Sequence, residues 1–113
     1  GSCTRIPYVL LVNEKSASAA EILAAAVKEN DGGKLVGTET YGKGIIQSSI
    51  DFKDGTGLRL TTMQYLSPKG NKIHKTGVKP DYQVELSAKS KTDKQFEKAL
   101  EVLKKEVKQS SQK

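Results

Sequence analysis

The sequence has few of the residues that most often bind metals or form covalent cross-links. Its 113 residues include one cysteine, Cys3, one histidine, His74, and no tryptophan. A single cysteine excludes an internal disulfide framework and a cysteine-rich zinc site. A transition-metal site made of one histidine and carboxylates is not expected either, so the sequence predicts no metal and no cofactor.

Long apolar runs are also missing. The run Val9–Val12 is only four residues long, whereas a transmembrane helix needs about 20 apolar residues. Hydrophobic residues make up 35% of the chain. Together with the length, this content allows one small domain with a modest core.

The positive charge is not gathered into one basic patch, although the formal net charge is +6. Residues 87–113 contain eight Lys and four acidic residues, whereas residues 1–86 contain eleven Lys or Arg and nine acidic residues. The excess therefore lies mostly in a tail rich in Lys and Glu, without interleaved aromatic residues. We expect no nucleic-acid partner.

Hydrophobic patterning predicts an α/β fold with a mixed sheet and flanking helices. An alanine-rich helix is expected over Ser16–Glu29, because the segment combines strong helix propensity with a stop at Asp31-Gly32-Gly33. Strands are expected where β-forming residues cluster, at Ile6–Val12 (as a buried strand), Lys34–Gly37, Ile45–Phe52, Leu58–Leu66 and Tyr82–Leu86.

A second helix is predicted to begin at Thr92, after a linker. Thr92-x-x-Gln95 matches a capping box. The apolar residues that follow at helical spacing form one stripe, at Phe96, Leu100, Leu103 and Val107. We expect this stripe to pack on the sheet of the same chain, and pairing with a partner is the alternative. Residues 87–113 are thus a linker and helix of the same domain as residues 1–86.

One motif resembles a phosphate-binding loop. Gly37 to Lys43 matches G-x-x-x-x-G-K and follows a predicted strand. However, Gly44 stands where Ser or Thr would bind magnesium, and Ile45–Phe52 is a predicted strand, whereas a phosphate site needs a helix N-terminus. These departures argue against nucleotide binding.

A second motif could supply a nucleophile. Ser18 follows a predicted strand at the start of a helix, where free backbone N–H groups and the helix dipole favour a developing oxyanion. Ser18-x-x-Glu21 is also a capping box, and capping alone is the commoner role of such a serine.

A nucleophilic serine needs a base, and two residue types could serve. His74 lies in a polar segment rich in Lys and is expected at the surface. A lysine can replace histidine if desolvation lowers its pKa from about 10.4 toward neutrality. Lys43, between Gly42 and Gly44 and before Ile45, is the lysine in the most apolar and closely approached segment.

Several motifs, in order along the chain, resemble those of the carboxyl-terminal processing peptidases, also called tail-specific proteases. The similar segments span about Val9 to Asp81 and comprise Ser16-Ala17-Ser18-Ala19-Ala20-Glu21-Ile22, Val36-Gly37, Thr40-Tyr41-Gly42-Lys43-Gly44-Ile45-Ile46-Gln47, Leu60-Thr61-Thr62, Ser67-Pro68-x-Gly70 and Gly77-Val78-Lys79-Pro80-Asp81. The resemblance implies a fold similar to part of a ClpP- or crotonase-like core and a serine endopeptidase that acts near the carboxyl terminus of unfolded proteins.

The resemblance also implies roles for individual residues. The nucleophile of the family falls on Ser18, the lysine base on Lys43, and the glutamine that orients the base on Gln47. Ala19 could supply one oxyanion N–H. In an extended strand four residues cover about 13 Å, so Lys43 and Gln47 meet only if the chain bends, which Gly44 permits, or if the long lysine side chain folds back.

Family members are longer than this chain. They carry a PDZ domain, which selects substrate tails, and an upstream protease segment, which supplies a second oxyanion N–H. The resemblance therefore implies residues 1–86 to be a protease core segment with an incomplete site, from a parent exported to the bacterial cell envelope or plastid lumen. A catalytically silent structural or assembly module is the alternative, and homo-oligomerisation stays open.

Overall fold

The computed structural model describes residues 6–111, so the single cysteine, Cys3, lies outside the described part. Its elements, in chain order, are β1 (Val9–Val12), α1 (Ala19–Glu29), β2 (Lys34–Gly37), β3 (Ile45–Asp51), β4 (Gly57–Gln64), β5 (Tyr82–Gln83) and α2 (Lys94–Ser111). Strands β1, β2 and β5 form a parallel sheet in the order β1-β2-β5, and β3 and β4 form a separate antiparallel pair. The predicted α/β class is confirmed, with the parallel and antiparallel pairs in two sheets.

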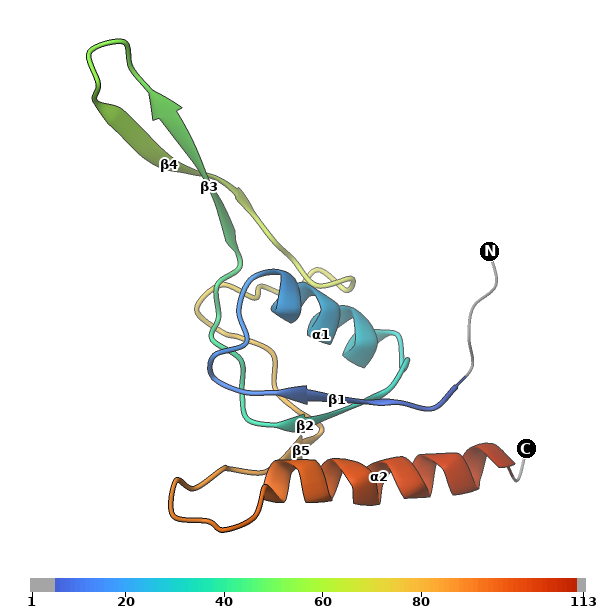
Figure 1. Ribbon diagram of the computed structural model, residues 1–113. Coiled ribbons are helices and arrows are strands. Elements are labelled where there is room, and N and C mark those ends of the chain that lie inside the picture. Colours follow the sequence, from blue (N-terminus) through green and yellow to red (C-terminus); the bar gives the residue numbers. More distant parts are fainter. Residues whose placement is uncertain (1–5, 112–113) are drawn as a thin grey trace.

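The parallel sheet lies between the two helices, α1 on one face and α2 on the other (Figure 1). Successive residues of β2 serve the two layers, as strand geometry requires. Leu35 is fully buried in the cluster that includes Ala24 and Ala25 of α1, and Val36 is fully buried in the cluster that includes Val102 of α2. Burial on both sides explains why β2 is apolar.

The β3–β4 hairpin projects away from this layered core (Figure 1). Every residue of β4 is exposed, including Leu58 and Leu60. The ladder is interrupted by a register shift between Ile46 and Gln47, where Ile46 pairs with Met63 but Gln47 pairs with Thr61. This β-bulge is the main irregularity of the hairpin, and it lies at the end nearest the core.

β1 and β5 are each three residues shorter than predicted. β1 begins at Val9 instead of Ile6, and it is an edge strand whose Leu11 is 45% exposed, so the expectation of a buried strand is wrong for much of its length. β5 ends at Gln83 because it pairs only with the last two residues of β2.

α2 begins differently from the prediction. The Oδ1 of Asp93 accepts the N–H of Phe96 at 3.0 Å, so Asp93 caps the helix and Thr92 does not. The side chain of Gln95 turns back to the preceding segment, where its Nε2 donates to the carbonyl of Val84 at 2.9 Å. This bond attaches the first turn of α2 to the end of β5.

The predicted packing stripe of α2 is also wrong. Ala99 and Val102 are the buried residues, whereas Phe96 and Val107 are about half exposed. A helix can approach a sheet closely through small side chains, and the larger apolar side chains are then left beside the contact. Since the expected stripe took account of hydrophobicity but not of side-chain size, it selected the neighbouring face.

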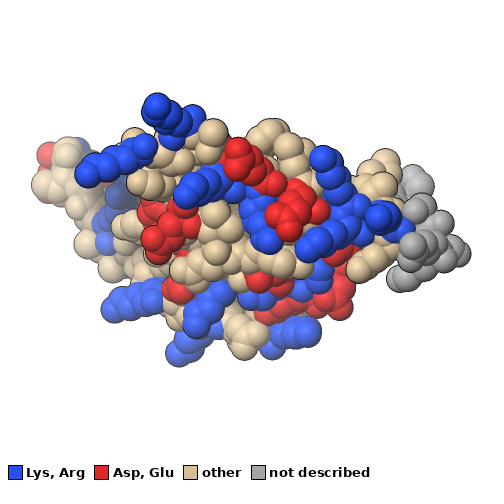
Figure 2. Space-filling model, turned by 90° about the horizontal axis from the view of Figure 1, so that it is seen from below, with Lys and Arg blue, Asp and Glu red and all other residues tan. Residues whose placement is uncertain are grey.

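Basic and acidic side chains are interspersed over the α2 side of the molecule, which is the face seen from below in Figure 2. Within α2 itself, Lys98 and Lys105 both pair with Glu101 at 3.5 Å. The excess of Lys in the tail is therefore partly balanced locally. Neither helix of the described chain is long and apolar enough to cross a membrane.

Candidate active site

Ser18 lies in a strained turn between β1 and α1. Its backbone has φ 57° and ψ −117°, and it occupies the N-cap position of α1. A positive φ is uncommon for a residue with a side chain and costs on the order of 1–3 kcal/mol. A nucleophile on a sharp, strained strand-to-helix turn is exposed above the elements that hold it. The predicted position of Ser18 at a helix start is confirmed, and its strain was not predicted.

The capping box is formed through the carboxylate of Glu21. Glu21 Oε1 accepts the N–H of Ser18 at 3.1 Å. The N–H of Glu21 bonds the backbone carbonyl of Ser18 at 3.0 Å, and Ser18 forms no side-chain cap hydrogen bond. The capping box predicted for Ser18 and Glu21 is present, and the carboxylate of Glu21 makes its hydrogen bond at 3.1 Å.

Glu21 connects the turn at Ser18 to the loop that contains Lys43. Its side chain is fully buried, and besides Ser18 it serves three donors of the loop between β2 and β3. Oε1 accepts the Lys43 N–H at 2.8 Å, while Oε2 accepts the Gly42 N–H at 2.8 Å and the Thr40 hydroxyl at 2.6 Å. One carboxylate thus fixes the backbone on both sides of the site.

These bonds also exclude the phosphate-loop interpretation of Gly37 to Lys43. A phosphate site needs free backbone N–H groups, and those of Gly42 and Lys43 are already bonded to Glu21. The chain then continues into β3 and not into a helix.

Gly42 and Gly44 let this loop pack against the segment that follows β4. Gly42 has φ +90°, and its carbonyl accepts the Lys75 N–H at 2.8 Å. A Cβ on Gly44 would lie 2.5 Å from the backbone nitrogen of His74. The close approach predicted around Lys43 is therefore confirmed for the backbone, but the Lys43 side chain is exposed and not desolvated within the described chain.

The predicted catalytic side chains line one small pocket of about 250 Å³. Its lining residues are Ser18, Lys43, Ile45, Ile46, Gln47, Arg59 and Tyr65. Ile46 and Gln47 both border the pocket, at the point where the β3–β4 register shifts because β4 has one extra residue, Thr62. Lys43 and Gln47 thus border the same pocket, and a bend of the chain that lets their side chains meet stays a prediction.

The N–H of Ala19 also agrees with the expected site. The hydrogen bonds at the start of α1 involve the N–H groups of Ala20, Glu21 and Ile22, and none within residues 6–111 takes the N–H of Ala19. It is one of the unpaired donors at a helix N-terminus and directly follows Ser18.

His74 does not line the pocket that holds Ser18. It is half-buried because its segment packs against Gly44, so it is less exposed than the expected surface histidine. Its Nδ1 is buried without a hydrogen-bond partner among the described residues. The geometry favours Lys43 over His74 as the neighbour of Ser18.

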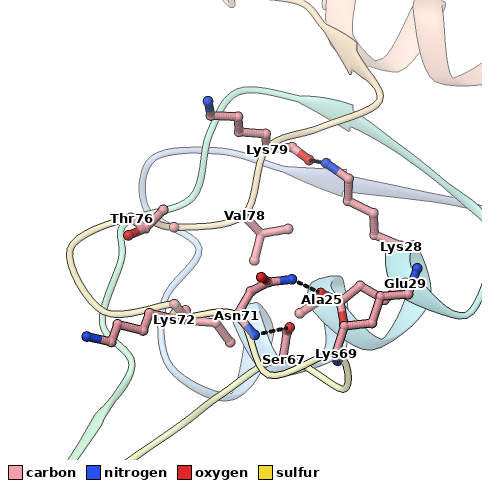
Figure 3. Close-up of a pocket in the computed structure, with 12 residues that line it drawn as sticks. Ala25, Lys28, Glu29, Ser67, Lys69, Asn71, Lys72, Thr76, Val78 and Lys79 are labelled. Carbon is pink, nitrogen blue, oxygen red and sulfur yellow. Dashed lines mark hydrogen bonds between the residues drawn. The ribbon is translucent and has the colours of Figure 1, made fainter.

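A larger cavity, of about 410 Å³, lies between α1 and the segment after β4 and contains none of the predicted catalytic residues (Figure 3). Glu29 accepts hydrogen bonds there from Asn71 Nδ2 at 3.0 Å and from the Lys69 N–H at 2.7 Å. Hydrogen bonding by the Ser67 side chain is the main cause that holds the pKa of Glu29 below its usual value, and hydrogen bonds from Asn71 and Lys69 add to it, although desolvation opposes the shift. This cluster attaches the segment to α1.

Three residues of the site were not identified from the sequence. Glu21 was assigned only a capping role, because its bonds to the loop before β3 depend on tertiary packing. Arg59 and Tyr65 belong to β4 and the segment after it, and only strand pairing brings them beside Gln47.

The family model described as peptidase family S41 matches residues 2–84. A carboxyl-terminal-processing protease of Synechocystis sp. is 42% identical over 108 residues, which cover 90% of this chain and 25% of that protein. A probable CtpA-like serine protease of Staphylococcus aureus is 45% identical over 76 residues, covering 67% and 15%.

A solved structure of a C-terminal processing protease is also similar to this chain. The photosystem II D1 C-terminal processing protease superposes with a TM-score of 0.69 at 40% identity, covering 86% of this chain and 24% of that one. The chain therefore spans about a quarter or less of the length of these relatives. From the sequence match, the shared fold and the resemblance of the site motifs, the chain belongs to peptidase family S41.

Proposed function

We propose that the chain is the part of a serine endopeptidase that carries a Ser18–Lys43 dyad. The supporting observation is that Ser18, in a strained N-cap turn, shares a 250 Å³ pocket with Lys43 and Gln47. Glu21 bonds the backbones of both dyad residues and thereby fixes their relative position. The substrates we propose are unfolded or partly folded proteins, cleaved near their carboxyl terminus.

In the proposed reaction, the Oγ of Ser18 attacks the scissile carbonyl carbon while neutral Lys43 Nζ takes the hydroxyl proton. The N–H of Ala19 stabilises the oxyanion. When the C–N bond breaks, Lys43 returns the proton to the leaving amine, which leaves an ester on Ser18. Water, deprotonated by Lys43, then hydrolyses the ester and restores both groups. Gln47 orients the lysine.

Lys43 is exposed in this chain, so the desolvation that its proposed role requires has to come from elsewhere. A lysine acts as a base near neutral pH only when it is desolvated. In the complete enzyme, we propose that bound substrate and the upstream protease segment cover the pocket, and that this segment supplies a second oxyanion donor. Removing one such donor lowers turnover by about 10²–10³-fold. A PDZ domain of the parent would present the substrate tail, and the parent would be exported to the bacterial cell envelope.

Cleavage of an unstructured protein by the complete enzyme tests this proposal. Ser18→Ala and Lys43→Ala should each abolish cleavage, whereas Lys53→Ala, which removes an exposed lysine at the hairpin turn, should not. Cleavage that persists in Ser18→Ala would refute the dyad.

A silent assembly module remains the second candidate, because Phe96, Leu100 and Val107 expose apolar surface along α2. A mass that rises with concentration in solution, together with no cleavage by the complete enzyme, would favour that function over the protease. A monomer that cleaves protein would exclude it.

A further inference from the structure

Arg59 borders the pocket from β4, whereas Ser18 lies in the turn before α1, Lys43 in the loop before β3, and Gln47 on β3. Arg59 lies on β4 directly opposite Ser49 of β3, two positions from Thr61, which is opposite Gln47. Residues paired in this way, and those two positions along, share one face of a hairpin. Arg59 and Gln47 are therefore diagonal neighbours on the face that borders Ser18.

The pocket contains two basic side chains and no acidic one, since its charged lining residues are Lys43 and Arg59. The ion pairs within residues 6–111 are those of α2 and do not include Arg59. Asp51, the next residue of β3 on this face, forms no ion pair with it. The carboxylate of Glu21 is already bonded to four donors. Arg59 thus has a charge and five N–H donors without an anionic partner in the described chain.

In an unmodified peptide substrate, the group whose charge is opposite to that of an unpaired guanidinium is the carboxylate. Peptide amides are neutral, whereas a carboxylate accepts two parallel N–H bonds from arginine and compensates its charge. A carboxylate in a peptide comes either from an Asp or Glu side chain or from the chain terminus. Either carboxylate could bind Arg59 without displacing Ser18 or Lys43, because Arg59 borders the pocket from β4.

We propose that Arg59 is a specificity-determining residue that binds a substrate carboxylate close to the scissile bond. This inference rests on the proposed peptidase function and deepens it, because it assigns a charge preference to the same pocket. One exposed charge pair contributes up to about 1 kcal/mol. We therefore expect about a fivefold preference in kcat/KM for a substrate with the carboxylate over its neutral twin.

Matched peptides cleaved by the complete enzyme test the assignment. One series replaces Asn by Asp at successive positions on either side of the cleaved bond, with an amidated terminus. A second series compares free and amidated termini. Arg59→Gln should remove the preference for the charged twin in one of these series, and the series affected identifies the source of the carboxylate. Lys53→Gln, which removes a positive charge from the hairpin turn outside the pocket, should keep the preference.

A binding measurement separates failure of this inference from failure of the proposed function. Fluorescence anisotropy of the same peptides with the Ser18→Ala protein needs no turnover. If the Ser18→Ala protein binds the charged peptide more tightly than its neutral twin, and Ser18→Ala/Arg59→Gln does not, the role of Arg59 is supported. This holds even if the wild-type enzyme cleaves neither peptide, and such a lack of cleavage would contradict the proposed protease function. Equal losses for charged and neutral peptides, or no preference in the wild type, would overturn the role of Arg59.

Discussion

The backbone nitrogen of Lys43 lies 2.8 Å from Oε1 of Glu21. Glu21 itself follows Ser18, the proposed nucleophile, by three positions. Because the same oxygen accepts the N–H of Ser18, the distance between the two backbones depends on one buried side chain. Glu21 makes no contact with substrate in this account. It is a positioning residue, and its removal should affect both loops together.

Glu21→Gln should reduce stability and activity together. Each carboxylate oxygen of Glu21 accepts two hydrogen bonds, Oε2 from the Thr40 hydroxyl and the Gly42 N–H, and Oε1 from the N–H groups of Ser18 and Lys43. In either orientation, the NH₂ group of glutamine would therefore face two donors instead of accepting from them. Leaving buried donors unpaired costs about 1–3 kcal/mol. Urea unfolding should show a loss in this range, and kcat of the complete enzyme should fall.

Glu39→Gln is the matched control, because Glu39 is exposed in the same loop. It should change the free energy of unfolding by less than about 0.5 kcal/mol. If Glu21→Gln were as harmless as this control, the carboxylate would not be what joins the two loops.

Ser18→Gly should be at least as stable as Ser18→Ala. Alanine keeps the strained φ of 57°, whereas glycine adopts it freely and only loses chain entropy of about 0.5–1 kcal/mol on folding. Ala26→Gly, in the interior of α1, provides the contrast and should lose about 1 kcal/mol. Thermal melting of the three variants checks the order. A melting temperature for Ser18→Gly well below that of Ser18→Ala would argue against strain at this turn.

Lys43→Ala should abolish turnover and leave folding nearly intact. The side chain is exposed and the backbone N–H that bonds Glu21 is retained in alanine. Melting temperature and cleavage rate of the complete enzyme measure the two effects separately. A large loss of stability with activity retained would remove Lys43 from the mechanism.

Glu29→Gln should make stability less sensitive to acid. The hydrogen bonds from Ser67, Asn71 and Lys69 lower the pKa of Glu29 in the folded state. Such a group stabilises the fold above its unfolded pKa of about 4.3, and this contribution is lost as the pH falls through the lower folded pKa. The difference in melting temperature between wild type and variant should therefore shrink from pH 7 to pH 3. A difference that stayed constant over this range would contradict the assigned cause.

Two valines of α2 test which face packs on the sheet. Val102 is 1% exposed and Val107 is 50% exposed. Val102→Ala should lose about 2 kcal/mol of unfolding free energy through lost burial and the remaining cavity, and Val107→Ala less than about 0.5 kcal/mol. If the two substitutions lowered the unfolding free energy equally in denaturant titrations, the conclusion that Val102 packs on the sheet and Val107 does not would be wrong.

Local signals predicted much of this molecule because they decide local structure. The alanine-rich segment and the glycines after it predicted α1, and the β-forming runs predicted β2 and β3 closely. The register shift at Ile46 and Gln47 was not predictable in the same way, because a bulge depends on the partner strand. For the same reason, no local pattern indicated that Arg59 would lie beside Gln47.

The site shows the same division between local and tertiary information. The family motifs indicated Ser18, Lys43 and Gln47, and the structure places all three around one pocket. The buried contacts of Glu21 depend on how the loop before β3 packs on α1, which no local pattern specifies. The strain at Ser18 likewise requires the tertiary structure that maintains it.

The account depends most on Ser18 as the nucleophile, and mass spectrometry of the acyl-enzyme tests this directly. The complete enzyme is mixed with a peptide active ester, quenched in acid and digested. If Ser18 is the nucleophile, the acyl group is on the peptide that contains Ser18, and Ser18→Ala is not acylated. An acyl group on another residue, or acylation that persists in Ser18→Ala, would contradict it.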